Sequence, residues 1–213
     1  MRKRIVVLIS GSGSNLQAIM DAIEVGQING RIEAVLSNKA DAYGLERARR
    51  ADIPTLFLSH TEFDKRESFD QAMIELIDQY QPDLIVLAGF MRILSAEFVR
   101  HYQGKMFNIH PSLLPKYKGL NTHQRAIDAG DAEHGCTVHF VTEELDGGPL
   151  AVQGKVSIDS QDSAESLQQK VHEVEHLIYP RAIEWFCANR LKWTLDGVYL
   201  DGKPLPPQGY LMN

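Results

Sequence analysis

Short apolar runs alternate with longer amphipathic segments through the first half of the chain. The runs IVVLIS (residues 5–10), RIEAVLS (31–37) and LIVLAG (84–89) have the length of strands, and the last is apolar on both faces. The longer segments between such runs repeat their apolar residues every three or four positions, as an α-helix does. This alternation predicts βαβ units and a parallel sheet. The expected helices span residues 14–26, 43–53, 64–80, 96–102 and 163–190, and further strands span 55–59, 106–110, 136–142 and 149–158.

The pattern changes after residue 110. Residues 112–123 form a stretch with Pro, Gly and Lys that predicts a long loop, and long connections inside compact domains are often functional. Two strand-like runs then flank the turn EELDGG, which indicates antiparallel strands. The last helix contains Pro180, where we expect a bend or a break. We therefore expect one α/β domain over residues 1–213, with a Rossmann-like, mostly parallel sheet flanked by helices and antiparallel strands added toward the C-terminus.

Composition supports a soluble globular class. The 213 residues are 44% hydrophobic and 23% charged, and no run approaches the roughly 20 apolar residues of a membrane span. The net charge of -6 comes from interspersed acids and bases, which gives no nucleic-acid footprint. The start MRKRIVVLIS is too short in its apolar part for a signal peptide. The two cysteines, Cys136 and Cys187, suit a reducing compartment, so we expect a cytoplasmic protein.

Two glycines, Gly11 and Gly13, separate the first expected strand from its helix, and Ser14 and Asn15 follow them. Backbone N–H groups converge at such a turn, and the helix N-terminus adds partial positive charge, so the turn suits a phosphate. The dinucleotide fingerprint needs a third glycine, but Leu16 occupies that position, which favours a phosphomonoester over NAD. A tight, capped turn without a ligand is the alternative.

A pair of polar residues ends the expected strand MFNIH. Asn108 and His110 lie two residues apart, so they share one face at the carboxyl end of the strand, where open α/β sheets bind ligands. A histidine can move a proton near neutral pH, and an amide can donate to a developing oxyanion, so the pair suits transfer at a carbonyl carbon. The alternative is a strand end whose polar groups bond to nearby backbone.

A carboxylate would complete this pair by orienting the imidazole ring. Asp146 in EELDGGP is preferred to Glu143 and Glu144, because the two glycines after it allow close backbone approach. An aspartate that only forms the turn is the alternative.

Five segments carry a resemblance along almost the whole chain: GSGSNLQAI, LAGFMRIL, FNIHPSLLPKYKG, CTVHFVTEELDGGP and PPQGY. They resemble the phosphoribosylglycinamide formyltransferases, also called glycinamide ribonucleotide transformylases, which are folate-dependent enzymes of purine biosynthesis. The resemblance implies transfer of a formyl group from the cosubstrate 10-formyltetrahydrofolate to the amine of glycinamide ribonucleotide, without a metal. Asn121 in KGLNTH departs from the histidine expected in close relatives, which leaves the contact of this loop with phosphate open.

The resemblance also implies roles for particular residues. Asn108 and His110 would face the formyl oxygen that gains negative charge, and His110, held by Asp146, would move the proton. Glu175 would bind the ribonucleotide. The phosphate site would be formed by Gly13, Ser14 and Asn15. The folate site would be formed by Arg66, Met91, Arg92, Ile93 and Leu94 together with Asn108.

Related activities remain as alternatives. Formyltetrahydrofolate hydrolase and the transferase acting on initiator methionyl-tRNA share the N-x-H and aspartate site, but the first would carry a regulatory domain and the second a basic C-terminal domain, which we do not expect in this chain. A non-catalytic sensor of phosphoribosyl compounds would use the glycine loop alone. We expect small-molecule substrates, no nucleic-acid or membrane partner, and a monomer or homodimer.

The segment HEVEH, residues 172–176, matches the H-E-x-x-H pattern of zinc proteases. His172 and His176 would be ligands, Glu173 a base and Glu184 the candidate third ligand, but the G-x-x-H continuation is missing. We therefore expect these histidines to lie on the flanks of an apolar helix face that includes Leu177.

Three other histidines, His60, His101 and His134, lie in polar segments and are expected to be solvated. His139 alternates with apolar residues in a strand and is a candidate neighbour of His110.

Overall fold

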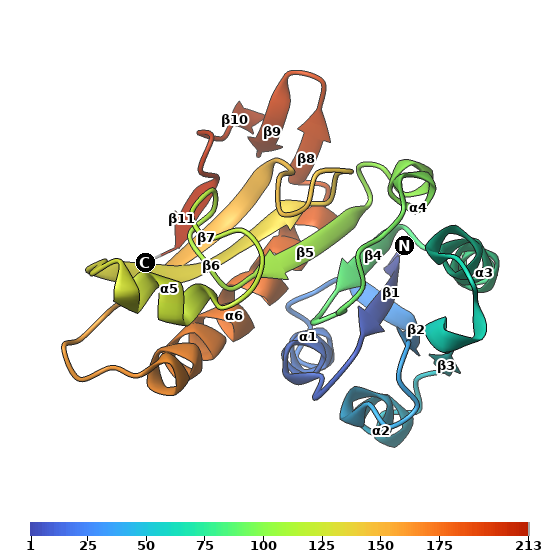
Figure 1. Cartoon of the computed structure of the whole chain (residues 1–213). Helices are drawn as coiled ribbons and strands as arrows, with labels where there is room; N and C mark the ends of the chain where they lie inside the picture. Colours follow the sequence, from blue (N-terminus) through green and yellow to red (C-terminus); the bar gives the residue numbers. More distant parts are fainter. Residues whose placement is uncertain (213) are drawn as a thin grey trace. The chain divides into compact units, whose positions relative to one another are not determined.

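The computed structural model describes residues 1–212, and the chain divides into two compact units, Met1–Asn108 and Ile109–Asn213 (Figure 1). Strand β5 (Met106–His110) carries the chain from the first unit into the second. That the chain behaves as a single domain stays a prediction.

The first unit is an α/β unit with parallel strands. Its strands lie in the order β5-β4-β1-β2-β3, and every neighbouring pair is parallel. The strands are β1 (Lys3–Ile9), β2 (Gly30–Ser37), β3 (Thr55–Phe57), β4 (Leu84–Leu87) and the first part of β5. The helices are α1 (Ser14–Glu24), α2 (Tyr43–Arg50), the 3₁₀-helix η1 (His60–Glu62), α3 (Arg66–Asp78) and α4 (Ala96–His101).

Burial explains why the central strands have apolar residues at successive positions. Strand β1 lies between β2 and β4, and its residues Ile5–Ile9 are fully buried. A strand covered on both faces gains from apolar side chains at every position. Helix α1 instead buries one stripe, formed by Leu16, Ile19 and Ala22. The βαβ alternation predicted from the sequence is confirmed in this unit.

The second unit combines antiparallel strands with a long helix. Strands β6 and β7 are antiparallel, β11 runs parallel to β7, and β8, β9 and β10 form a separate three-stranded antiparallel sheet. Helix α6 packs on β6 and β7. The elements are α5 (Thr122–Asp128), β6 (Glu133–Phe140), β7 (Leu150–Ser157), α6 (Ala164–Cys187), β8 (Leu191–Thr194), β9 (Gly197–Leu200), β10 (Lys203–Pro204) and β11 (Tyr210–Met212).

The predicted fold class is confirmed, with differences in the second unit. The expected loop of residues 112–123 runs into helix α5, which the sequence pattern missed. Helix α6 is not broken at Pro180, because Tyr179, Pro180 and Ala182 are buried, so packing offsets the lost backbone hydrogen bond. The short C-terminal strands were also missed. In the described part of the chain, no helix is both long enough and apolar enough to cross a bilayer.

Candidate functional site

The glycine loop follows β1 and leads into α1 in the first unit. Gly13 is the N-cap residue of α1 with φ 72°, a conformation that L side chains rarely adopt. A Cβ on Gly13 would lie 2.6 Å from the Cα of Gly44, so the backbone of α2 approaches too closely for any side chain there. Ser14 and Asn15 begin α1, and the N–H groups of this first turn suit an anion.

A second loop begins after β4 and contains the sequence GFMRIL. Its Met91 and Ile93 are 65% and 57% exposed, which is unusual for large apolar side chains and suits contact with a flat apolar ligand. Arg92 and Leu94 alternate with these two residues and are half-buried. The loop is fixed next to the glycine loop, because the Met91 N–H donates to Oγ of Ser10 at 2.8 Å.

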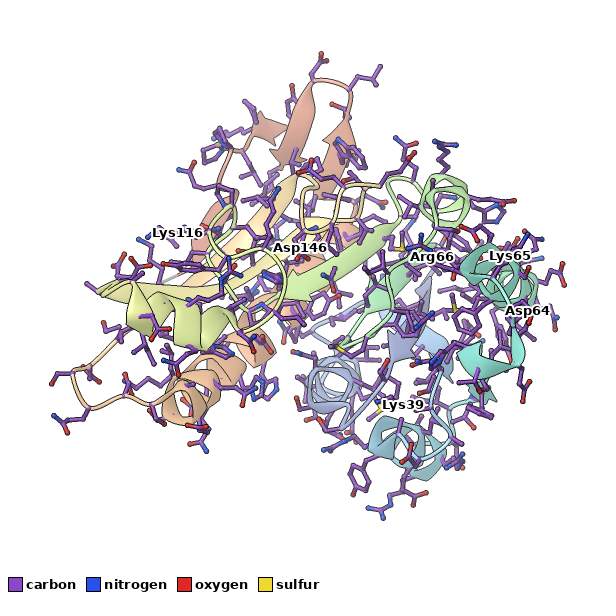
Figure 2. All side chains as sticks on the ribbon, in the orientation of Figure 1. Lys39, Asp64, Lys65, Arg66, Lys116 and Asp146 are labelled. Atoms are coloured by element: carbon purple, nitrogen blue, oxygen red, sulfur yellow. The ribbon has the colours of Figure 1, made fainter. Side chains whose placement is uncertain are left out.

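Arg66 begins α3, as Figure 2 shows, and one helical turn later Asp70 is 1% exposed. Burial raises the pKa of the Asp70 carboxyl group, whereas a hydrogen bond from the Ser95 N–H and the charges of Arg66 and Arg92 oppose this rise. The structure therefore brings two of the predicted folate-site residues, Arg66 and Arg92, close to one buried carboxylate. The sequence pattern gave no signal for Asp70, which lies inside an ordinary helical repeat.

His110 and Asp146 meet in the second unit. His110 Nδ1 lies 3.5 Å from Asp146 Oδ1, and the residues are 6% and 8% exposed. The Nε2–H group of His110 donates to the carbonyl oxygen of Tyr117 at 2.8 Å, since a carbonyl oxygen only accepts. The ring is therefore held through Nε2, with Nδ1 directed at the carboxylate. Tyr117 was not predicted, because its contribution comes from the backbone.

Asp146 is itself held by the loop after β5. Its Oδ2 accepts from the Gly119 N–H at 2.9 Å, and its own φ is 50°. A Cβ on Gly148 would lie 1.7 Å from the carbonyl oxygen of Phe140, so the backbone approach expected from the two glycines is present at Gly148. Figure 2 shows Asp146 on the turn between β6 and β7, and Lys116 on the loop after β5.

His139 is a third polar group at this carboxylate. Its Nε2 lies 4.0 Å from Asp146 Oδ1, and its Nδ1–H donates to the Phe140 carbonyl at 3.0 Å. Burial lowers the pKa of His139, and the nearby charge of His110 lowers it further, although the hydrogen bond to Phe140 and the charge of Asp146 oppose both. The neutral ring of His139 therefore borders the His110–Asp146 pair.

The remaining predicted residues lie elsewhere in the two units. Asn108 is the last residue of the first unit, and it is half-buried on β5. Glu175 is 5% exposed on α6. Burial raises the pKa of the Cys136 thiol on β6, and the charge of Glu175 raises it further. Asn121 is the N-cap residue of α5 with φ 57°, a left-handed conformation that asparagine tolerates well.

Two expectations about histidines and one about Leu177 can be compared with the structure. The rings of His172 and His176 stack with centroids 6.4 Å apart, and residues 1–212 contain no cluster of three metal-binding side chains. Leu177 is 63% exposed, so it lies outside the apolar face that the helix buries. His134 is 1% exposed, contrary to expectation, because strand β6 is covered along almost its whole length.

Comparison with known proteins agrees with this arrangement. A family model described as formyl transferase matches residues 3–183. The chain is 58% identical over 206 residues to the phosphoribosylglycinamide formyltransferase of Escherichia coli (strain K12), covering 97% of each protein. It is 52% identical over 208 residues to the protein of that name from Haemophilus influenzae, covering 98% of each.

A solved structure supports the same assignment. The phosphoribosylglycinamide formyltransferase of Coxiella burnetii matches with a TM-score of 0.96 and 55% identity, over 100% of both chains. The family model, the sequence relatives and this structure all extend over most or all of the residues that form the two units. The chain therefore belongs to the formyl transferase family.

Proposed function

We propose that the protein transfers the formyl group of 10-formyltetrahydrofolate to the amine of N1-(5-phospho-D-ribosyl)glycinamide, giving the N-formyl product in purine (IMP) biosynthesis. The observation that carries this proposal is the buried His110–Asp146 contact of 3.5 Å in a chain of the formyl transferase family. The two relatives named above are phosphoribosylglycinamide formyltransferases, and this chain aligns with nearly the whole length of each.

The proposed chemistry is transfer of the formyl group from a nitrogen of the folate to the nitrogen of the substrate amine. Bound 10-formyltetrahydrofolate supplies the formyl group that the substrate amine attacks. The Asn108 amide donates to the formyl oxygen as that oxygen gains negative charge. The bond between the formyl carbon and the folate nitrogen then breaks and tetrahydrofolate leaves. His110 moves the proton released by the amine to that nitrogen, and Asp146 stabilises the ring when it is charged. The contacts with the phosphate and the folate hold the substrate amine next to the formyl carbon.

Binding of the ribonucleotide phosphate is assigned to Gly13, Ser14 and Asn15. This assignment is supported by the N-terminus of α1, where N–H groups of the first helical turn and the helix dipole favour an anion. Glu175 is assigned to the ribonucleotide on the basis of family resemblance.

The folate site is assigned to Asn108, Arg66 and the loop residues Met91, Arg92, Ile93 and Leu94. Two exposed apolar side chains, Met91 and Ile93, fit a flat heterocyclic ring, and the guanidinium of Arg66 fits a carboxylate at the other end of the cosubstrate. No metal has a place in this chemistry. We also propose a cytoplasmic location, a monomer or homodimer, and no nucleic-acid or membrane partner.

The test follows loss of the formyl group from 10-formyltetrahydrofolate by absorbance, with and without glycinamide ribonucleotide. Turnover that requires the ribonucleotide supports the transferase. Turnover without it would replace the proposal by the hydrolase, and saturable ribonucleotide binding without any turnover would replace it by a sensor. A chelator control completes the assay, since loss of turnover with a chelator would contradict chemistry without a metal.

A further inference from the structure

The carbonyl groups of the glycine loop are held by helix α2. The Gly44 N–H donates to the Gly11 carbonyl oxygen at 3.0 Å, and Nε–H of Arg47 donates to the Ser12 carbonyl oxygen at 2.8 Å. The N–H and C=O groups of a trans peptide point in opposite directions. The N–H groups of Ser12 and Gly13 therefore point away from α2.

Packing makes this arrangement rigid. Gly13 and Gly44 approach so closely that a Cβ on either residue would lie 2.6 or 3.2 Å from the Cα of the other. The contact between Gly44 and Gly11 also satisfies one of the N–H groups that every helix N-terminus leaves unpaired. Helix α2 is therefore fixed against the loop at its backbone.

Arg47 links this loop to α1. Its Nη1 donates to Oε1 of Gln17 at 3.3 Å, and its guanidinium carbon lies 4.8 Å from the centroid of the Tyr43 ring. The planar guanidinium is thus held by Ser12, Gln17 and Tyr43 together, a geometry that lysine does not reproduce. A cation that binds the Ser12 carbonyl polarises the peptide, which makes the Gly13 N–H a stronger donor.

We propose that Arg47 is a positioning residue for the phosphate of the ribonucleotide. It fixes and polarises the Ser12–Gly13 peptide from the side opposite to the anion, so that the loop N–H groups are oriented before the phosphate arrives. This inference rests on the proposed function, because it assumes that the glycine loop binds the substrate phosphate. It assigns to the phosphate site one more residue, whose side chain acts through the loop backbone.

Arg50 provides a matched control on the same helix. It is exposed, its guanidinium carbon lies 5.9 Å from the same Tyr43 ring, and it pairs with Glu46 at 2.9 Å. Arg47→Ala and Arg50→Ala therefore remove the same side chain, the same charge and a contact with the same ring. Only Arg47→Ala removes the hydrogen bond to Ser12.

Steady-state kinetics and phosphate binding test the inference. We expect Arg47→Ala to raise KM for glycinamide ribonucleotide about 10-fold, as the loss of one charge-assisted hydrogen bond would, with kcat and KM for 10-formyltetrahydrofolate close to wild type. The Kd of inorganic phosphate, measured by calorimetry, should rise by a similar factor. Arg50→Ala should change neither value.

Chemical rescue separates positioning from a general structural role. Arg47 borders a surface hollow of about 560 Å³, so added guanidinium ion can reach the space left by Arg47→Ala. We expect guanidinium to restore phosphate affinity in Arg47→Ala, without an effect on the wild type. Equal changes in both variants, an unchanged phosphate Kd in Arg47→Ala, or equal rises in both KM values would overturn the inference.

The two proposals can fail separately. Turnover by the wild type with the ribonucleotide decides the proposed function. Phosphate binding needs no turnover, so the comparison of Arg47→Ala with Arg50→Ala by calorimetry decides the role of Arg47 even if the formyl transfer is absent. A wild-type protein that turns over normally but shows no phosphate binding would also overturn the role of Arg47.

Discussion

The hydroxyl group of Ser10 donates to Oδ1 of Asn38 at 2.6 Å, and both side chains are buried. The same hydroxyl accepts from the Met91 N–H at 2.8 Å. Because the amide oxygen of Asn38 is used as an acceptor, its Nδ2 donates to His60 Nδ1 at 3.2 Å. These three hydrogen bonds therefore fix which group donates and which accepts. Through them Ser10 connects the glycine loop to the loop that contains Met91.

Ser10→Ala should weaken both the fold and the folate loop. The change leaves the Met91 N–H and the Asn38 oxygen without the buried hydroxyl, which costs about 1–3 kcal/mol of unfolding free energy. We expect KM for 10-formyltetrahydrofolate to rise. Urea unfolding and steady-state kinetics measure the two effects, with Ser160→Ala in an exposed turn as control. A Ser10→Ala variant with wild-type stability and KM would contradict this role.

His110→Ala should lower kcat by about 10²–10⁴, the range for a positioned acid-base group. Asp146→Asn should also lower kcat, because the charge next to Nδ1 is lost, although the amide oxygen can still accept from Gly119. Asp146→Ala loses both interactions, so its melting temperature should fall further than that of Asp146→Asn. Stopped assays and thermal melts separate the two effects.

The control for this prediction is His101→Ala. His101 is an exposed histidine paired with Asp78 at 2.8 Å, and it should tolerate the change without loss of turnover. Near-normal kcat in His110→Ala would remove His110 from the mechanism.

Gly148→Ala should destabilise the turn that carries Asp146. The added Cβ would lie 1.7 Å from the Phe140 carbonyl oxygen, so strand backbone has to move, and overpacking of this kind costs about 1–3 kcal/mol or more. Gly147→Ala is the matched control, because the three atoms nearest to its Cβ would all belong to the flexible side chain of Glu144. Equal urea midpoints for the two variants would argue against the close approach at Gly148.

Acid should destabilise the protein through His134. Burial is the main cause that lowers its pKa to about 4, helped by the charges of His123 and His110 and opposed by Asp131. An unfolded histidine titrates near 6.5, so between about pH 4 and 6.5 the unfolded chain binds more protons. The contribution of His134 is therefore complete above about pH 6.5 and is lost as the pH falls toward 4.

Urea unfolding between pH 7 and pH 4.5 measures this loss, which reaches at most about 1.4 kcal/mol per pH unit for one proton. His134→Gln should flatten the dependence, whereas His101→Gln at the exposed site should preserve it. A slope that is the same in His134→Gln and the wild type would assign the acid sensitivity to other groups.

The single-domain prediction can be tested by comparing two probes of unfolding. Both tryptophans, Trp185 and Trp193, lie in the second unit, so fluorescence follows that unit, whereas far-UV circular dichroism follows both. Coincident urea transitions are expected for a single cooperative domain. Two transitions, with fluorescence following only one, would show that the units unfold independently.

The sequence alone determined the parallel α/β class, because buried strands and amphipathic helices have different periods. The fully buried run of β1 and the single apolar stripe of α1 follow directly from this rule. It also indicated Asn108, His110 and Asp146 as candidates, from a strand end and a glycine turn. Their close approach to ligands stays a prediction, whereas the contact between His110 and Asp146 is present.

Only the tertiary structure decided which distant groups hold the candidate residues. Tyr117 and Gly119 act through backbone atoms, which leave no trace in residue type. Ser10 and Met91 are 81 positions apart, and they meet because the parallel strands β1 and β4 are neighbours. Burial of His134 and continuity of α6 through Pro180 likewise depend on packing between elements, and a local pattern of polar residues or a single proline contains no information about that packing.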